Sequence, residues 1–207
     1  MPPMIEIEAL AMASRRRHIG PFALRVEAGE TVGLVGPNGS GKTTCIRLTL
    51  GLDRSDRGRS RIHGRVVSPW HPPTGVGVVL EADGCYPWLS GRENLRLFAQ
   101  VLGRPVVEID AALEQVGLTP AADQTVHQYS RGMRQRLAFA RASLGGPSLF
   151  VLDEPTVALD GDAGSWLVEL LNAHAVAGGA TLVASHDETF LHALGARIVA
   201  VDDGRCG

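Results

Sequence analysis

The glycine-rich stretch at residues 36–44, GPNGSGKTT, is the feature that most restricts the fold of this 207-residue chain. It follows an apolar run at 31–35, precedes the helical pattern KTTCIRLTLGL, and satisfies the spacing G-x-x-x-x-G-K-[ST]. In such a strand–turn–helix unit the glycines let backbone N–H groups converge on phosphate oxygens, and the helix N-terminus adds its positive end. The stretch therefore predicts an α/β domain that holds a phosphate-bearing ligand at the end of a buried strand.

The same stretch supplies candidate ligand contacts residue by residue. We expect the Lys42 side chain to reach the β and γ phosphates of a nucleoside triphosphate, and the Thr43 hydroxyl to take a position on Mg²⁺. The predicted nucleotide-binding set is Gly36, Pro37, Asn38, Gly39, Ser40, Gly41, Lys42, Thr43 and Thr44.

Short apolar runs alternate with helical patterns along the rest of the chain, which is typical of a mainly parallel sheet. We predict buried strands at 31–36, 76–81, 149–154, 181–185 and 198–203, and an antiparallel β flank from the runs at 4–10 and 22–27. Between residues 85 and 146 only helical patterns occur, and Ser90 and Glu93 have the spacing of a capping box. The expected architecture is one domain over residues 1–207, a P-loop core with a helical subdomain inserted at about 85–146.

Composition and charge exclude several classes of protein. The formal net charge is -2, so a cluster of arginines at 131–141 is a local feature, and a general nucleic-acid binder is not indicated. The 3 cysteines form no CxxC pair, which favours a reducing compartment over a disulfide framework or a zinc site. There is no apolar run of membrane-spanning length, and Glu6 and Glu8 interrupt the N-terminal region where a signal peptide is apolar. We therefore expect a cytoplasmic chain that reaches a membrane only through a partner.

Two adjacent carboxylates end the apolar run LFVLDE at 149–154. Asp153 at the strand end is placed to hold Mg²⁺ through water, and Glu154 to polarise an attacking water as general base. Alone, the pair also fits a solvated turn. The phosphate-binding stretch upstream favours the catalytic interpretation.

Taken together, these motifs resemble the ATP-binding subunit of an ABC transporter across nearly the whole chain. The segment YSRGMRQRLAFARA at 129–142 resembles the family's signature motif, usually Leu-Ser-Gly-Gly-Gln, with Ser130 and Gly132 in its two most characteristic places. The resemblance implies that the Ser130 hydroxyl and the Gly132 backbone bind the γ-phosphate of ATP held on another subunit's P-loop. It also implies that most of the arginines here are structural or interfacial on a helix flank, and that the bound phosphates belong to ATP and not to nucleic acid.

The remaining motifs follow in the family's order. VALD at 157–160 resembles the D-loop, which implies that Asp160 lies at a dimer interface. ASHD at 184–187 resembles the switch, which implies that His186 contacts the γ-phosphate and acts with Glu154 in catalysis. Glu81 stands where most of the family has the Gln of the Q-loop, which implies a Mg²⁺ ligand beside Thr43 and Asp153; a strand-end carboxylate is the alternative.

Several positions depart from the family pattern. Arg131 replaces the first Gly of the signature and Met133 its Gln, as in the S-x-G-M versions of ABC-2-type exporters, and Val157 replaces the usual D-loop Ser. The segment LAMASRRRHIGPFAL at 10–24 offers no aromatic ring near the place where the family stacks one on adenine. An arginine of 15–17 stacked on the base and a solvated basic loop both remain open, and we predict weak discrimination between ATP and GTP.

The resemblance implies an ATP-binding and hydrolysing subunit of an ABC exporter, which uses ATP and Mg²⁺ and powers a separate membrane-spanning permease. It implies a homodimer or heterodimer of ATP-binding subunits, placed peripherally on the inner face of the cell membrane. The segment YPWLSGREN at 86–94 resembles that of drug and peptide-antibiotic exporters, which favours efflux of such compounds. Tyr86, Trp88 and Leu89 in this segment are candidate contacts for the permease. The alternatives are a haem-exporter ATPase of cytochrome c maturation and a soluble, non-transport ABC ATPase.

Overall fold

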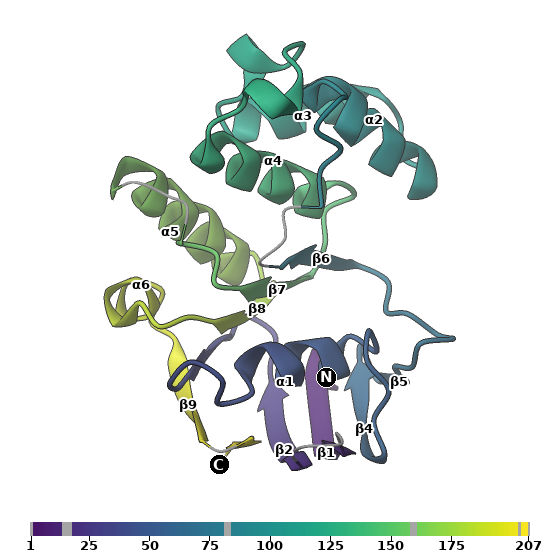
Figure 1. Cartoon of the computed structure of the whole chain (residues 1–207), viewed down its shortest axis with the longest axis vertical. Helices are drawn as coiled ribbons and strands as arrows, with labels where there is room; N and C mark the ends of the chain where they lie inside the picture. The colour runs from purple at the N-terminus through teal and green to yellow at the C-terminus, as the bar shows by residue number, and fades with distance from the viewer. Residues whose placement is uncertain (1, 14–17, 81–83, 158–160, 203, 207) are drawn as a thin grey trace.

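The computed structural model describes residues 2–13, 18–80, 84–157, 161–202 and 204–206, and for 161–163 only the backbone. Its centre is a six-stranded sheet in the order β10-β9-β3-β8-β7-β6 (Figure 1). Its strands are β3 (Thr31–Val35), β6 (Val76–Val79), β7 (Leu149–Asp153), β8 (Ala180–Ala184), β9 (Arg197–Asp202) and β10 (Arg205–Cys206). All neighbours are parallel except β9 and β10, so the predicted mainly parallel sheet is confirmed, with a strand in each of the five predicted stretches. The predicted burial holds for β3, β7 and β8 but is wrong for β9, where every residue except Val199 and Val201 is exposed, because only the two-residue strand β10 lies beyond it in the sheet.

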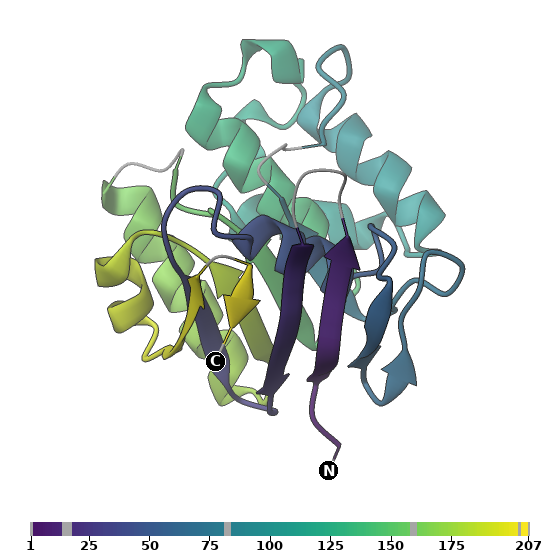
Figure 2. The ribbon, with the colours of Figure 1, turned by 60° about the horizontal axis from the view of Figure 1, so that its bottom comes forward.

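A second, antiparallel sheet has the order β2-β1-β4-β5 and faces the viewer in Figure 2. It contains β1 (Ile5–Ala13), β2 (His18–Val26), β4 (Arg57–Ile62) and β5 (Arg65–Val66). The predicted antiparallel flank is confirmed by the pairing of β1 with β2. The strands β4, β5 and β10 were not predicted from the sequence.

Charged side chains explain why β4 forms without an apolar run. Arg59 lies 2.6 Å from the Glu8 carboxylate and Arg61 lies 2.7 Å from it, across the paired strands β4 and β1. On the other face of the same strand, Ser60 and Ile62 are buried. Opposite charges directly across an antiparallel pair stabilise it by a few tenths to about 1 kcal/mol. The strand therefore depends on a partner strand more than 40 residues away.

Helix α1 (Lys42–Thr49) lies between the two sheets. Its buried Cys45, Ile46 and Leu48 belong to one apolar cluster with residues of β1, β2 and β4 on one side and of β3, β7 and β8 on the other. This packing fixes the helix that follows the glycine-rich stretch against both sheets. The opposite face of the six-stranded sheet is covered by α5 (Gly161–Val176) and α6 (Glu188–Ala193) (Figure 1).

Every element assigned between β6 and β7 is helical in the described part of that segment. These are α2 (Gly91–Val101), α3 (Val107–Gln115), the 3-10 turns η1 (Thr119–Ala121) and η2 (Val126–Gln128), and α4 (Arg131–Ser143). The predicted capping box is confirmed: Glu93 N donates to Ser90 Oγ, and Ser90 N donates to Glu93 Oε2. That second bond holds the pKa of the Glu93 carboxyl below its ordinary value.

Candidate nucleotide-binding site

Three neighbouring strands, β3, β8 and β7, end at the same edge of the six-stranded sheet. The glycine-rich stretch follows β3, His186 follows β8, and Asp153 ends β7. Hydrogen bonds continue beyond the strand ends, from Ser185 N to Leu34 O and from Glu154 N to Ala184 O. Ligands of parallel α/β sheets bind at this carboxyl edge, and the predicted phosphate and catalytic residues of one chain meet there.

The glycine-rich stretch requires glycine at two places for different reasons. A Cβ on Gly36 would lie 2.1 Å from Val201 O, so the loop passes too close to β9 for any side chain. Gly41, directly before α1, has a φ of 111°, which L-residues with side chains rarely adopt. These two positions let the loop curl tightly over the start of α1, where backbone N–H groups face an anion.

Two buried polar side chains converge on this loop. Lys42 is 7% exposed, and its Nζ donates to Gly36 O at 2.7 Å and to Pro37 O at 3.4 Å. Ser40 is 3% exposed, and its buried Oγ has no hydrogen-bond partner among the described residues. A buried hydroxyl of this kind costs free energy unless something bonds to it, and a phosphate oxygen would do so. Thr43 is exposed and Thr44 half-buried at the start of α1.

The carboxylates after β7 differ sharply in environment. Asp153, the last residue of β7, is 2% exposed, whereas the side chain of Glu154 is 20% exposed. Glu154 also has a φ of 48°, in the left-handed region that few non-glycine residues occupy. Glu154 Oε2 lies 2.8 Å from His186 Nδ1 and accepts a longer bond from His186 N. The two residues predicted to be catalytic are therefore in direct contact. The unusual backbone at Glu154 turns the chain so that this contact can form.

One polar residue near this site was not singled out from the sequence. Gln135, on α4, is 8% exposed, and its amide donates to Pro155 O at 3.2 Å. The bond ties α4 to the turn that carries Glu154. Gln135 stands between Arg134 and Arg136 in the sequence, so no local pattern marked it as buried.

The predicted signature residues lie at the start of α4. Ser130 caps this helix, with its Oγ accepting from Met133 N at 3.1 Å, and both Ser130 and Arg131 are exposed. Ser130, Gly132 and Met133 line a hollow of about 270 Å³, together with Gly117, Leu118, Pro120, Ala121 and Arg136. No residue of the glycine-rich stretch lines it. In Figure 1, α4 lies above the strands β6 and β7 and α1 lies below them. The structure therefore does not bring the signature residues of a chain to that chain's own phosphate-binding loop.

Three of the arginines on α4 make structural contacts, two within the helical segment and one to α5. An Arg134 guanidinium nitrogen donates to Tyr129 O at 3.0 Å, and Arg141 donates to Gly84 O while lying 4.9 Å over the Phe98 ring. Arg136 lies 6.0 Å over the Trp166 ring. The expectation that most of these arginines are structural is confirmed for these three.

The structure describes two of the three candidate Mg²⁺ ligands, Thr43 and Asp153. Glu81 lies outside the described residues, as do Asp160 and residues 15–17. The Thr43 hydroxyl and the Asp153 carboxylate are oxygen donors of the kind that Mg²⁺ prefers, so the residues present fit this ion. No helix in the described part of the chain has both the length and the apolar character needed to cross a membrane.

A glycine-rich loop between a strand and a helix, with two carboxylates at the end of a nearby parallel strand, defines a P-loop nucleotide-binding protein. The chain belongs to the ABC transporter family, whose model matches residues 19–157. A solved structure of an ATP-binding subunit of an ABC transporter is 27% identical, has a TM-score of 0.89, and covers 98% of this chain and 88% of its own. The predicted fold, that of an ABC ATPase domain, is therefore confirmed.

Curated relatives have names of the same kind. The chain is 41% identical to an uncharacterized ABC transporter ATP-binding protein, YdbJ, of Bacillus subtilis, over 76% of this chain and 53% of the relative. It is 36% identical to Nod factor export ATP-binding protein I of Burkholderia thailandensis, over 89% of this chain and 62% of the relative. It is 35% identical to a fluoroquinolones export ATP-binding protein of Mycobacterium tuberculosis, over 87% and 60%. The chain thus spans between half and two thirds of the length of these relatives.

Proposed function

We propose that the chain is the ATP-binding and hydrolysing subunit of an ABC exporter, acting through a separate membrane-spanning permease from the inner face of the cell membrane. The observation that carries this proposal is the Glu154–His186 contact of 2.8 Å at the sheet edge that also carries the P-loop. A base and its partner residue placed beside a phosphate-binding loop suit hydrolysis of a terminal phosphate and not simple nucleotide storage.

The P-loop residues 36–44 bind and orient the nucleotide in this proposal. Backbone N–H groups of the loop face the phosphates, and Lys42 exchanges its bonds to two loop carbonyls for phosphate oxygens. Thr43 and Asp153 would hold Mg²⁺, with Glu81 as the proposed third ligand, and the ion would neutralise charge on the phosphates.

Glu154 acts as general base toward the attacking water. Its carboxylate is anchored at one oxygen by His186, which leaves the other oxygen to accept a proton. His186 lies at the exposed rim of the site, with 63% of its side chain accessible. When both ring nitrogens are protonated, His186 donates to Glu154 from Nδ1 and to the γ-phosphate from Nε2.

A complete site in this proposal needs two ATP-binding subunits. The signature residues Ser130, Arg131, Gly132 and Met133 begin α4, away from the P-loop of the same chain. A second subunit turned head to tail would present this helix start, with its positive dipole end, to the γ-phosphate. This chain carries both a P-loop and a signature, so we propose a homodimer, with a heterodimer as the alternative. In either dimer, Asp160 is proposed to lie at the interface.

An exposed apolar surface beside α2 is the proposed contact for the permease. Trp88 is 70% exposed and Tyr86 39%, and their rings meet edge to face at 5.6 Å. Leu97 and Val101, one turn apart on α2, are also exposed, whereas Leu89 is half-buried. Exposed aromatic residues in contact with each other, as Tyr86 and Trp88 are, are typical of a surface that another protein covers.

The proposed cargo is a drug or a peptide antibiotic. Support comes from relatives named for export, one of them for fluoroquinolones. The alternatives are a haem-exporter ATPase and a soluble ABC ATPase outside transport. The permease contributes most of the cargo contacts in such systems, so its identity would distinguish the first two classes.

Affinity purification tests the transport proposal. The Glu154→Gln protein would be isolated with ATP and Mg²⁺ from detergent-solubilised membranes, and the co-purified proteins identified by mass spectrometry. We expect a protein with several membrane-spanning helices, and less of it when Trp88→Ala is added. Recovery of a soluble ATP-bound dimer alone would instead support the non-transport alternative.

We also expect GTP to compete with ATP for the site within about tenfold, because discrimination between bases needs polar groups that match one base edge. The described side chains nearest Gly41 of the P-loop are apolar: Ile19 Cγ2 lies 3.4 Å and the ring of the buried Phe22 lies 3.6 Å from a Cβ built on Gly41. Displacement of a fluorescent ATP analogue by GTP measures this. A failure of GTP to compete would show that the base is read specifically.

A further inference from the structure

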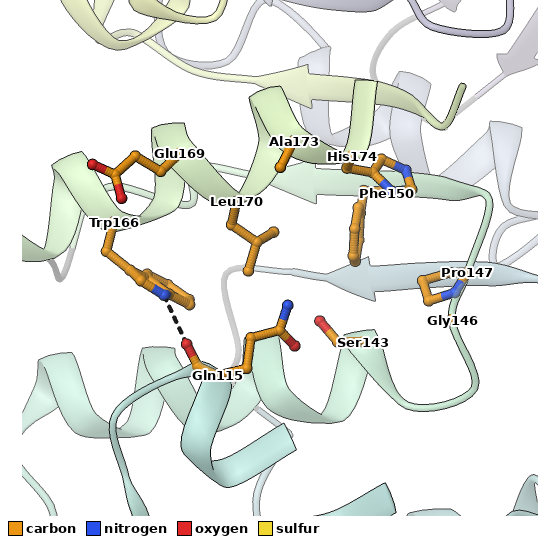
Figure 3. A pocket seen from close by; sticks show the side chains of 10 residues that line it. All are labelled: Gln115, Ser143, Gly146, Pro147, Phe150, Trp166, Glu169, Leu170, Ala173 and His174. Carbon is orange, nitrogen blue, oxygen red and sulfur yellow. Dashed lines mark hydrogen bonds between the residues drawn. The ribbon is translucent and has the colours of Figure 1, made fainter. Parts of the chain in front are cut away.

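Trp166, on α5, makes directed contacts with two helices of the helical segment, and Figure 3 shows the contact with Gln115 of α3. Its indole Nε1 donates to the backbone oxygen of Gln115, the last residue of α3, at 2.9 Å. Its ring meets Phe139 of α4 edge to face, with centroids 5.8 Å apart and planes at 84°. Arg136 of α4 lies over the same ring. One side chain thus joins α5 to both α3 and α4.

The two elements that Trp166 joins carry different halves of the proposed ATP site. Helix α4 begins at Ser130, in the signature, and lies against β6. Helix α5 belongs to the core, where it packs on β8, and it follows the turn that carries Glu154 by only a few residues. The orientation of α4 relative to α5 therefore sets the geometry between the two halves.

Apolar packing alone fixes this orientation poorly. Leu137 of α4 and Leu167 of α5 share one buried cluster, but apolar contact has no preferred direction. Beside that cluster, a hollow of about 500 Å³ separates the C-terminal ends of α3 and α4 from α5. Figure 3 shows Gln115, Ser143, Leu170 and Trp166 around it. Because packing is interrupted here, the hydrogen bond and ring contacts of Trp166 supply a directional link between α4 and α5, in addition to the Gln135–Pro155 bond.

We propose that Trp166 is a positioning residue that sets the orientation of the signature helix α4 relative to the sheet edge with Asp153 and Glu154. In that orientation the signature of the chain can contact one ATP molecule while its P-loop and carboxylates contact another. This role rests on the proposed function. A helix of 13 residues is about 20 Å long, so a swing of about 10° displaces its start by roughly 3 Å. Hydrogen bonds to a phosphate tolerate only a few tenths of an ångström. Loss of the link weakens dimer closure while the P-loop still binds ATP.

The test compares Trp166→Phe with its parent, both carrying Glu154→Gln so that ATP persists. Phe keeps an aromatic ring against Phe139 but loses the N–H that bonds to Gln115. We expect the ATP concentration for half-maximal dimerisation, measured by light scattering after size exclusion, to rise about threefold to tenfold. Affinity of the monomer for a fluorescent ATP analogue is expected to stay within about twofold of the parent. Trp166→Ala, which removes the ring contacts as well, is expected to shift dimerisation further.

Trp70→Phe is the matched control, because Trp70 is 86% exposed and distant in sequence from every element of the junction. It is expected to dimerise as the parent does. Equal dimerisation of the Trp166→Phe protein and the parent would overturn the role of Trp166. So would an equal loss of ATP affinity and dimerisation, since that indicates general destabilisation. A parent that stays monomeric with ATP would contradict the proposed function itself, and this role with it.

Discussion

Replacing Glu154 with Gln is expected to lower the rate of ATP hydrolysis by about a hundredfold or more, because positioned acid–base groups contribute at least that factor. The amide has nearly the shape of the carboxylate, and its oxygen can still accept from His186 N, as Glu154 does now. It cannot accept a proton from water, so chemistry fails while binding persists. Phosphate release at saturating ATP measures the rate.

Glu114→Gln is the matched control for this experiment. It makes the same chemical change at an exposed position on α3, outside the site, and its turnover is expected to equal that of the wild type. The Glu154→Gln protein is also expected to keep bound ATP and to elute as a dimer. An unchanged hydrolysis rate would contradict the assignment of Glu154 as the base.

Replacing Lys42 with Ala is expected to weaken ATP binding by about a hundredfold, because hydrogen bonds from a charged donor are among the strongest in proteins. Lys42 is buried, with its Nζ held 2.7 Å from Gly36 O, so its ammonium is already aimed into the loop. Titration with a fluorescent ATP analogue measures the loss. Lys42→Arg keeps the charge but changes its shape, and is expected to recover only part of the affinity.

Lys42 also offers a direct chemical readout, because it is the only lysine in the chain. An amine-reactive reagent can modify only Lys42 and the N-terminal amine. ATP is expected to slow modification of Lys42 at least about tenfold while leaving the N-terminal amine unchanged in the same sample, as an internal control. Peptide mass spectrometry separates the two sites. If ATP left the rate at Lys42 unchanged, the nucleotide would not be contacting this side chain.

Strands that carry their own apolar run were predictable from the sequence, and strands that depend on a partner were not. The buried strands β3, β7 and β8 read as continuous apolar runs, as expected for a sheet covered on both faces. By contrast, β4 has the sequence RGRSRI, and it is held by pairing with β1, by ion pairs with Glu6 and Glu8 of that strand, and by burial of Ile62. The two-residue strands β5 and β10 are too short to give a pattern.

The features of the site also separate into those that were predictable from the sequence and those that were not. Spacing alone predicted Lys42 in the P-loop, and its placement at the start of α1 agrees. The Glu154–His186 contact, the Gln135–Pro155 bond and the Trp166–Gln115 bond join segments that are 20 to 51 residues apart. These contacts follow from how helices and strand ends are turned in the folded chain. The local sequence around each residue does not show which distant residue it will contact.

Cross-linking between two differently labelled copies tests the composite ATP site most directly. The three cysteines (Cys45, Cys85 and Cys206) are thiols outside any disulfide and would first be replaced, in the Glu154→Gln protein. One copy would then carry Asn38→Cys in the P-loop, and the other Arg131→Cys beside the signature; both positions are exposed. We predict that a short bis-maleimide joins the two copies efficiently with ATP and only weakly without it. Cross-linking that ATP does not change would contradict a site shared between the P-loop of one copy and the signature of the other.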